Sequence, residues 1–242
     1  MKAKRSLGQN FFINKNLGEY IIKIVNDSKC RNVVEIGPGT GFFTKYLIEF
    51  FQNVTVVEKD TLLAQDLKNR YPKVNVVNGD FIDVSLKEII QEETMFFGSL
   101  PFNVSKPIIR KIIESEYFKH PSFFIAQREV AQKYLYRKPY SSLSLVTSLY
   151  AESKHLLEIS PDSFRPKPNV TSSLISFIPK SLEIKDRKGV EELINLSFRQ
   201  PRKNLNNNLK NTKFIKGITN YQLLRPAQLS LDDYIKIYEY SL

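Results

Sequence analysis

Short apolar runs alternate with stretches of helical periodicity along the first half of the chain. The runs have the length and the β-branched or aromatic content of buried strands, and they span residues 32–36, 54–57, 74–78, 96–98 and 122–127. The intervening helical periodicity covers residues 42–51, 61–71 and 107–113, and Leu17, Ile21, Ile24 and Val25 predict one more helix before the first strand. This alternation predicts an α/β fold with an open sheet.

The pattern changes further along the chain. Helical residues 129–137 and 142–151 come first, and residues 155–159 and 172–178 then predict two strands that can pair as a hairpin. After Pro179 the strand pattern ends, and helical stretches follow near 189–198, 203–211 and 227–240. We therefore expect a first domain over residues 1–179 and a small all-helical domain over residues 180–242.

Composition narrows the class of protein. The chain has 242 residues and is 42% hydrophobic, which is enough apolar content to bury a core. Its formal net charge of +11 points to nucleic acid or to an anionic membrane surface. A single cysteine, Cys30, excludes an internal disulfide, and two scattered histidines argue against a metal site. With neither a secretory signal nor an apolar run of spanning length, we expect a soluble, cytoplasmic protein.

A glycine-rich segment, Gly37-Pro38-Gly39-Thr40-Gly41, directly follows the first predicted strand. Glycines let a backbone turn sharply and approach a ligand closely. Glu58 ends the second strand, 21 positions beyond Gly37, at the spacing that brings a carboxylate to a ribose hydroxyl pair. The Gly-x-Gly-x-Gly spacing differs from the dinucleotide fingerprint and so disfavours a nicotinamide dehydrogenase. It looks like the S-adenosylmethionine loop of class I methyltransferases.

Residues with polar side chains also come directly after the third and fourth predicted strands. Asp80 can accept a hydrogen bond from an adenine amine while Phe81 packs on its ring, although a helix cap and a core residue are the structural alternative. At the end of the fourth strand, Ser99-Leu100-Pro101-Phe102 offers a short polar side chain, a carbonyl fixed ahead of proline and a flat aromatic face. Such a set suits a planar base with an exocyclic amine, and strand ends of this kind are where open α/β sheets bind ligands.

Basic residues are concentrated in three segments. The N-terminal arm contains Lys4 and Arg5 and leads into Gln9-Asn10-Phe11-Phe12, whose amides and rings can contact both a nucleoside and a core. A stiff proline loop over residues 161–170 contains Arg165 and Lys167. Residues 199–216 contain six cations and no acid, which favours contacts to RNA phosphates.

These motifs, in this order, resemble the ribosomal RNA adenine dimethylase family over essentially the whole chain. The similar segments are Gly8-Gln9-Asn10-Phe11, Glu35-Ile36-Gly37-Pro38-Gly39, Glu58-Lys59-Asp60, Gly79-Asp80, Ser99-Leu100-Pro101-Phe102-Asn103, the proline loop, Arg199-Gln200-Pro201-Arg202-Lys203-Asn204-Leu205 and Arg225-Pro226-Ala227-Gln228-Leu229-Ser230-Leu231. The last two resemble the small-subunit branch, whereas macrolide-resistance methylases differ in their C-terminal part. The resemblance implies a Rossmann-like class I methyltransferase with a mostly parallel seven-stranded sheet.

The resemblance also implies roles for particular residues. It assigns S-adenosylmethionine binding to Gln9, Asn10, Phe12, Gly37, Gly39, Gly41, Glu58, Lys59, Asp80, Phe81 and Ser99. It assigns the chemistry to Ser99, Leu100, Pro101 and Phe102, and contact with RNA to Lys4, Arg5, Arg165, Lys167, Arg199, Arg202, Lys203 and Lys210. The implied product is N6-dimethyladenine, on two adjacent adenines of a small-subunit rRNA hairpin loop. The implied partner is an immature 30S-type subunit, bound by a metal-free monomer.

One departure from the family pattern, Ser99, keeps alternatives open. Ser99 stands where small-subunit dimethylases usually have Asn, and Phe102 stands where Tyr is also found. A serine oxygen still accepts a hydrogen bond, and an active enzyme is expected. Alternatives are a large-subunit methylase of the macrolide-resistance type and a non-catalytic RNA-binding or ribosome-assembly factor on the same fold.

Overall fold

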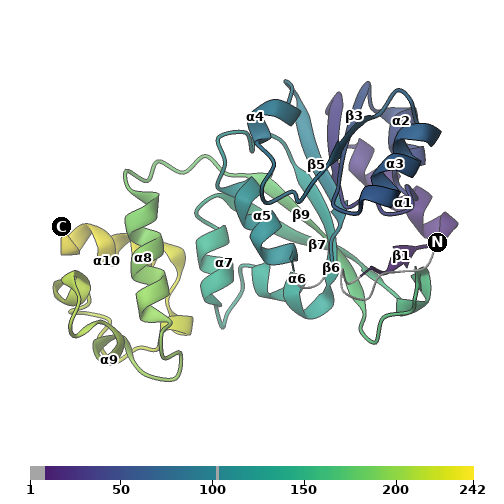
Figure 1. Ribbon diagram of the computed structural model, residues 1–242. Helices are drawn as coiled ribbons and strands as arrows, with labels where there is room; N and C mark the ends of the chain where they lie inside the picture. Colours follow the sequence, from purple (N-terminus) through teal and green to yellow (C-terminus); the bar gives the residue numbers. More distant parts are fainter. Residues whose placement is uncertain (1–8, 102–103) are drawn as a thin grey trace. The chain divides into compact units, whose positions relative to one another are not determined.

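The computed structural model describes residues 9–101 and 104–242 (Figure 1). Strands and helices alternate in the order that the apolar runs predict. The strands are β1 (Phe11–Phe12), β2 (Asn32–Ile36), β3 (Asn53–Glu58), β4 (Asn75–Asn78), β5 (Thr94–Ser99), β6 (Ser122–Gln127), β7 (Ala151–Ile159), β8 (Phe164–Arg165) and β9 (Ser172–Pro179). The helices are α1 (Lys15–Asn26), α2 (Thr44–Phe50), α3 (Thr61–Arg70), α4 (Leu86–Ile89), α5 (Ser105–Ile113), α6 (Arg128–Tyr134), α7 (Ser142–Thr147), α8 (Arg187–Ser197), α9 (Leu205–Leu209) and α10 (Leu231–Ser241).

The main sheet has seven strands in the order β4-β3-β2-β5-β6-β9-β7. The pairs from β4 to β6 are parallel, and β9 lies antiparallel to β6. Strands of this kind are buried on both faces and therefore have continuous apolar sequences, as the fully buried β2 shows. The predicted α/β fold with a mostly parallel sheet is confirmed, and β7 and β9 are neighbours as predicted.

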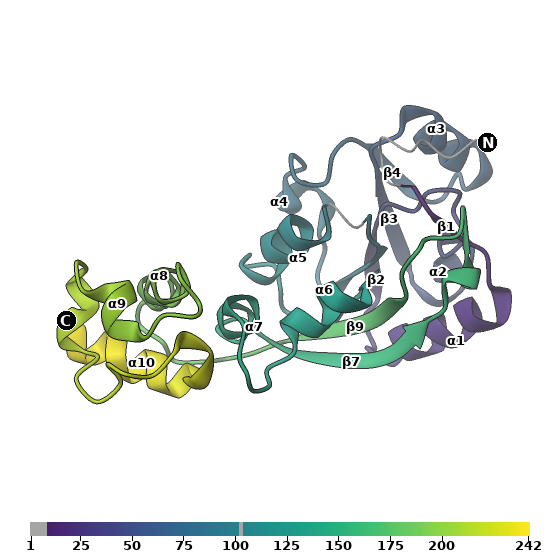
Figure 2. The ribbon, with the colours of Figure 1, turned by 90° about the horizontal axis from the view of Figure 1, so that it is seen from below.

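Helices cover both faces of the sheet, with α1 and α5 on opposite sides (Figures 1 and 2). One face packs against α1 and α2, where the core includes Ile21, Leu47, Val33 and Met95. Helix α1 begins at the cap residue Asn14, whose side chain accepts a hydrogen bond from the Leu17 amide at 3.1 Å. Its apolar stripe is the one that the sequence predicts.

Several predicted helix bounds were too wide. Helix α2 begins at Thr44 rather than Phe42, because the residues before it belong to the turn after β2. Helix α7 ends at Thr147, and the chain then enters β7 at Ala151, four residues before the predicted strand start. Strand β1 was not predicted. It pairs antiparallel with β8, so that Phe11 lies opposite Arg165.

The chain forms two compact units, one of residues 1–132 and 154–179 and the other of residues 133–153 and 180–242. The break after Pro179 coincides with the predicted boundary. The segment 133–153, which we expected in the first domain, packs with the C-terminal helices instead. Its Leu145 and Leu149 share a core with Leu193, Phe214 and Tyr234. Among the described residues, no helix is long and apolar enough to cross a membrane.

Candidate functional site

A pocket opens in the first unit where β2, β3, β4 and β5 end. Its lining comes from four neighbouring strand ends, from the N-terminal segment and from α5. The lining residues are Gln9, Asn10, Phe11, Ile36, Gly37, Gly39, Val57, Glu58, Lys59, Gly79, Asp80, Phe81, Ser99, Leu100, Pro101, Val104, Ile108, Ile125, Phe164 and Ser172. The strand register explains this meeting, because Ile36 lies opposite both Val57 and Gly98. The residues that follow these strands therefore come together at the carboxyl edge.

The Gly-rich loop, residues 37–41, forms one side of the pocket. Gly37, Gly39 and Gly41 have φ angles of +66°, +57° and +76°, a region that favours glycine. A Cβ on Gly37 would meet nothing within 4 Å, so open space lies over this residue. A Cβ on Gly39 would lie 3.0 Å from the ring of Phe11. The loop thus presents bare backbone to the pocket at Gly37.

Gly41 differs in its surroundings from the other two glycines of the loop. It does not line the pocket. A Cβ there would lie 2.7 Å from Leu67 of α3. The positive φ and the close approach of Leu67 therefore favour glycine here for the turn and for packing under α3, and the assignment of Gly41 to cofactor contact stays a prediction.

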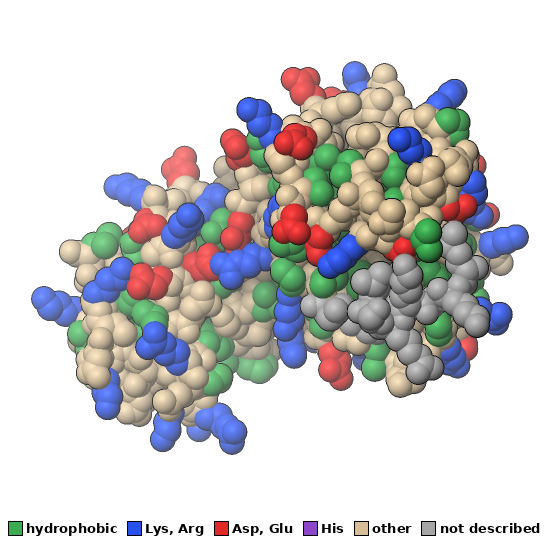
Figure 3. Space-filling model, in the orientation of Figure 1, with side chains coloured by type: hydrophobic (Ala, Val, Ile, Leu, Met, Phe, Trp, Pro, Cys, Tyr) green, Lys and Arg blue, Asp and Glu red, His purple; other side chains and the backbone are tan. Residues whose placement is uncertain are grey.

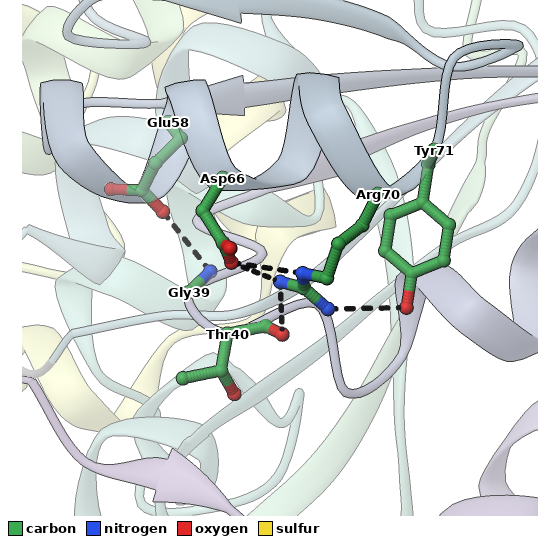
Figure 4. Close-up of polar contacts among 6 residues, drawn as sticks. All are labelled: Gly39, Thr40, Glu58, Asp66, Arg70 and Tyr71. Carbon is green, nitrogen blue, oxygen red and sulfur yellow. Dashed lines mark hydrogen bonds and ion pairs between the residues drawn. The ribbon is translucent and has the colours of Figure 1, made fainter. Parts of the chain in front are cut away.

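Two side chains from other elements hold the Gly-rich loop (Figure 4). Glu58 Oε2 accepts a hydrogen bond from the Gly39 amide at 3.0 Å, and Arg70 donates to the Thr40 carbonyl at 2.9 Å. Arg70 is in turn paired with Asp66, one helical turn earlier on α3, at 2.6 Å. Glu58 holds the loop from within the pocket lining, and Arg70 holds it from outside.

Glu58 is the buried carboxylate of the site, with 6% of its surface exposed. Its other oxygen accepts a hydrogen bond from the Asp60 amide at 2.8 Å. Burial raises the pKa of Glu58, against the lowering effect of these backbone hydrogen bonds. Since each carboxylate oxygen has two lone pairs, the group can also accept hydrogen bonds from a ligand.

Asp80, which follows β4, also lines the pocket and is paired with Lys59 at 2.7 Å. Its second oxygen accepts a hydrogen bond from the Ile82 amide at 3.0 Å. The hydrogen bond from Lys59, more than any other cause, lowers the pKa of Asp80, so the carboxylate is ionised at neutral pH. The structural alternative was a helix cap; Asp80 caps a turn rather than a helix, and this coexists with a position in the pocket lining.

The N-terminal segment covers one end of the pocket. Gln9 donates to Asp60 at 3.3 Å, and Gln9 and Asn10 both line the cavity. Phe12, assigned to the methyl donor, lies instead in the core, with its ring centroid 5.0 Å from Phe42 and 4.8 Å from Phe43. The neighbouring Phe11 is the pocket residue. Because side chains alternate along a strand, only one of the two rings can face the cavity.

Ser99, Leu100 and Pro101 meet at the pocket wall, as predicted. The Leu100 amide donates to the Ile125 carbonyl at 2.9 Å, and the Pro101 carbonyl accepts from the Ser105 amide at 3.1 Å. These two bonds fix the turn without using the Leu100 carbonyl. Phe102, predicted to stack on the base, lies outside the described residues.

Sequence reasoning missed Glu35, which lies on β2 just before the Gly-rich loop. It is 2% exposed and accepts a hydrogen bond from Thr44 at 2.6 Å, across the base of the loop. Burial raises its pKa to about 8. Apolar lining residues such as Ile36 and Val57 were also missed, although each is among the last apolar residues of a strand, which is a usable signal.

None of the described cations predicted to bind RNA belongs to the pocket lining. Arg165 and Lys167 are exposed, and Lys167 pairs with Asp162 at 2.6 Å. In the second unit, Lys and Arg side chains project into solvent (Figure 3), and the predicted set Arg199, Arg202, Lys203 and Lys210 is exposed. Lys213 is compensated by Glu192 at 2.7 Å, an acid outside the 199–216 segment. Lys4 and Arg5 lie outside the described residues.

Comparisons with known proteins agree on one family. The sequence model described as "Ribosomal RNA adenine dimethylase" matches residues 1–240. The chain is 33% identical over 243 residues to the ribosomal RNA small subunit methyltransferase A of Chlorobium phaeobacteroides, covering 98% of this chain and 90% of that protein. A dimethyladenosine transferase from Plasmodium falciparum has a similar structure, with a TM-score of 0.79 at 22% identity over 94% of this chain and 95% of that one. The 23S rRNA methyltransferase ErmE gives a TM-score of 0.74 at 22% identity, over 96% and 99%.

Proposed function

Because the chain belongs to the ribosomal RNA adenine dimethylase family, we propose that it dimethylates N6 of two adjacent adenines in a hairpin loop of small-subunit rRNA. S-adenosylmethionine is the methyl donor of this class of enzyme. The observation that supports the proposal most strongly is the pocket, in which the Gly-rich loop, Glu58, Asp80 and the Ser99 turn line one cavity. The relative from Chlorobium is named as a small-subunit enzyme, which favours that substrate.

The residues of the pocket fit the donor. Bare backbone at Gly37 leaves room for a ligand, since no atom lies within 4 Å of the missing Cβ. Glu58 accepts from the ribose hydroxyls, and the ionised Asp80 accepts from the adenine amine. Phe81 and Ile108 supply apolar walls for the purine.

The chain's own groups position the target amine. Bound S-adenosylmethionine supplies an electrophilic sulfonium methyl group. The N6 lone pair of adenine is delocalised into the ring while the amine lies in the ring plane. Ser99 Oγ and the Leu100 carbonyl accept hydrogen bonds from the two amine N–H groups and turn the amine out of that plane. The turn that carries them is fixed by the Leu100 and Pro101 hydrogen bonds to the backbone. Orientation is the main contribution, and no strong general base is required.

The target adenines reach this pocket only when they are unstacked, which favours a loop over a duplex. The exposed cations of the second unit bind the rRNA backbone and give affinity without reading sequence. The proposal makes the second unit the RNA-binding domain, with an immature 30S-type subunit as partner. In this proposal the protein acts as a monomer in the cytoplasm, where such subunits assemble.

A methyl-transfer assay tests the activity. Tritiated S-adenosylmethionine is supplied with immature small subunits or with large-subunit rRNA, and labelled adenines are mapped by mass spectrometry. We expect N6-dimethyladenine in the small-subunit rRNA alone. Label in the large-subunit rRNA would favour the ErmE-like alternative. RNA binding without label would make the chain a non-catalytic assembly factor.

The Ser99 turn provides the matched variants for this assay. Ser99→Ala removes one amine acceptor and should lower kcat by about 10- to 100-fold, as loss of a hydrogen bond in the transition state does. Ser99→Asn restores an acceptor and should retain activity, whereas Ser181→Ala at an exposed position serves as the control. Unchanged kcat in Ser99→Ala would remove Ser99 from the mechanism.

Salt dependence tests the RNA-binding surface. Replacing Arg199, Arg202, Lys203 and Lys210 together by Ala should reduce the slope of log K against log salt by roughly one for each phosphate that is no longer neutralised. The control replaces the exposed Lys23, Lys68, Lys73 and Lys87 of the first unit. Equal slopes for the two variants would show that RNA binding has no preference for the second unit.

A further inference from the structure

Lys111 of α5 binds the turn that follows β4. Its ammonium group donates to three backbone carbonyls, those of Phe81 at 3.0 Å, Ile82 at 2.6 Å and Val84 at 2.7 Å. A lysine has three N–H donors, so all of them are used on one short segment. Neither the family resemblance nor the proposed mechanism assigns this residue a role.

The segment that Lys111 binds, the 80–84 turn, contains two lining residues of the pocket, Asp80 and Phe81. The ammonium group of Lys111 also lies near the Phe81 ring, 5.5 Å from its centroid. Phe81 is buried and packs edge-on against Phe96 of β5, with ring centroids 6.3 Å apart. One ammonium group therefore binds the backbone of Phe81 and of the residues after it, directly C-terminal to Asp80.

Through helix α5, Lys111 also connects the 80–84 turn to the Ser99 turn. Helix α5 begins at Ser105, directly after that turn, and its Ile108 lines the pocket one helical turn before Lys111. Lys111 thus links α5, which follows the Ser99 turn, to the 80–84 turn, which contains Asp80. Burial lowers the pKa of Lys111, and the carboxylates of Asp83 and Asp80 oppose this effect. The three carbonyl acceptors match the three N–H donors of the ammonium form.

We propose that Lys111 is a positioning residue that determines the selectivity of the donor pocket for adenine, because it holds Asp80 at the distance needed to accept from the purine 6-amine. The inference rests on the proposed assignment of this cavity to S-adenosylmethionine. A residue that only stabilised the fold would affect all ligands of the pocket equally. Replacing Lys111 should instead lower the affinity for ligands with a 6-amine more than the affinity for ligands without one.

Calorimetry with two product analogues tests this prediction. S-adenosylhomocysteine has the 6-amine, whereas S-inosylhomocysteine has an oxygen that cannot donate to Asp80. The wild-type protein should bind the adenine analogue at least about 10-fold more tightly, as for one hydrogen bond to a charged group. In Lys111→Met this preference should fall to about 2-fold or less. The control, Lys119→Met, removes an exposed lysine just after α5 and should keep the wild-type ratio.

A double-mutant cycle and hydrogen exchange complete the test. In an Asp80→Asn background, Lys111→Met should leave the ratio unchanged, because the acceptor through which it acts is altered already. Amides of residues 82–84 should exchange faster in ligand-free Lys111→Met than in the wild type. If Lys111→Met does not fold, Lys111→Gln, which keeps two donors without charge, is expected to give an intermediate ratio.

The outcomes separate the inference from the function on which it rests. An equal loss of affinity for both analogues in the Lys111 variants, or an unchanged ratio, overturns the positioning role. Additive effects of Lys111→Met and Asp80→Asn on the ratio also overturn it. If the wild-type protein binds neither analogue, the assignment of the pocket to the methyl donor is wrong, whatever the variants do.

Discussion

The Gly-rich loop and the 80–84 turn follow strands of the same sheet and line the same pocket, but they are held by different means. The Gly-rich loop takes its shape from three glycines with positive φ, and the 80–84 turn contains no residue in that region. The outside contact of the Gly-rich loop is an arginine with 39% of its side chain exposed, paired with Asp66. The 80–84 turn is instead held by the three hydrogen bonds of Lys111.

The two sides of the pocket therefore depend on different parts of the sequence. The conformation of the Gly-rich loop is encoded in its own residues, since only glycine adopts those φ angles without strain. The 80–84 turn has local hydrogen bonds to Asp80, from the amides of Ile82, Asp83 and Val84, and is held in addition by a side chain that lies about thirty positions further along the chain. Substitution of its own glycines should therefore strain the Gly-rich loop, whereas substitution of Lys111 on α5 should loosen the 80–84 turn.

The largest effect is expected from Glu35, whose hydrogen bond with Thr44 spans the base of the Gly-rich loop. Its pKa is raised from 4.5 to about 8 by burial, so the folded protein keeps a proton that the unfolded chain releases above pH 4.5. The contribution of Glu35 to the free energy of unfolding should thus be largest below pH 4.5 and fall until about pH 8, by roughly 5 kcal/mol.

Urea unfolding of the wild type and of Glu35→Gln at several pH values measures this effect. The neutral amide cannot lose a proton, so the difference in unfolding free energy between the two proteins should change across that window. A difference that stays constant with pH would show that Glu35 is not protonated in the folded state.

The next effect is expected from Glu58→Gln, which weakens the loop anchor at the Gly39 amide and replaces an acceptor for the ribose hydroxyls. Weaker acceptance from the ribose hydroxyls, together with the weaker loop anchor, should lower the affinity for S-adenosylhomocysteine on the order of 100-fold. Calorimetry measures the affinity, with the exposed Glu49→Gln as the matched control. Affinity within about 3-fold of the wild type would contradict the assigned role of Glu58.

The glycines test whether local strain shapes only the first loop. Gly41→Ala combines a φ of +76° with a contact of 2.7 Å to Leu67, and should lower the free energy of unfolding by about 1–3 kcal/mol. At Gly79, just before the 80–84 turn, a new Cβ would contact only Val84, at 3.8 Å. Gly79→Ala should therefore change the free energy of unfolding by less than about 0.5 kcal/mol. Urea titrations compare the two variants, and equal losses would remove the distinction between the loops.

The smallest effect is expected from Arg70→Met. Its contacts with Asp66 and the Thr40 carbonyl are partly exposed, and such contacts contribute less than about 1 kcal/mol. Affinity for S-adenosylhomocysteine should therefore fall by less than about 5-fold. A loss as large as that in Lys111→Met would show that the outside contacts of the two loops are equivalent.

Much of the fold and of the site could be predicted from the sequence. Continuous apolar runs located the strands, and the strand-end rule brought Gly37, Glu58, Asp80 and Ser99 to one pocket. Where the sequence was not sufficient, the causes are physical. The apolar character of Phe12 does not reveal which way its ring points, and Gly41 looks like the other loop glycines until its packing under Leu67 is seen.

The segment 133–153 shows a further limit, since its apolar residues fit either unit by composition and only the shared core with residues such as Leu193 assigns them. The amino-acid sequence was sufficient for what is local or periodic in this protein: strand and helix order, the glycine turn, and the chemical groups at each strand end. The long-range pairings came from the tertiary structure, and they include Glu35 with Thr44, Phe11 over Gly39, and Lys111 on the 80–84 turn. Such contacts depend on three-dimensional distance and burial, which no linear pattern of residues specifies.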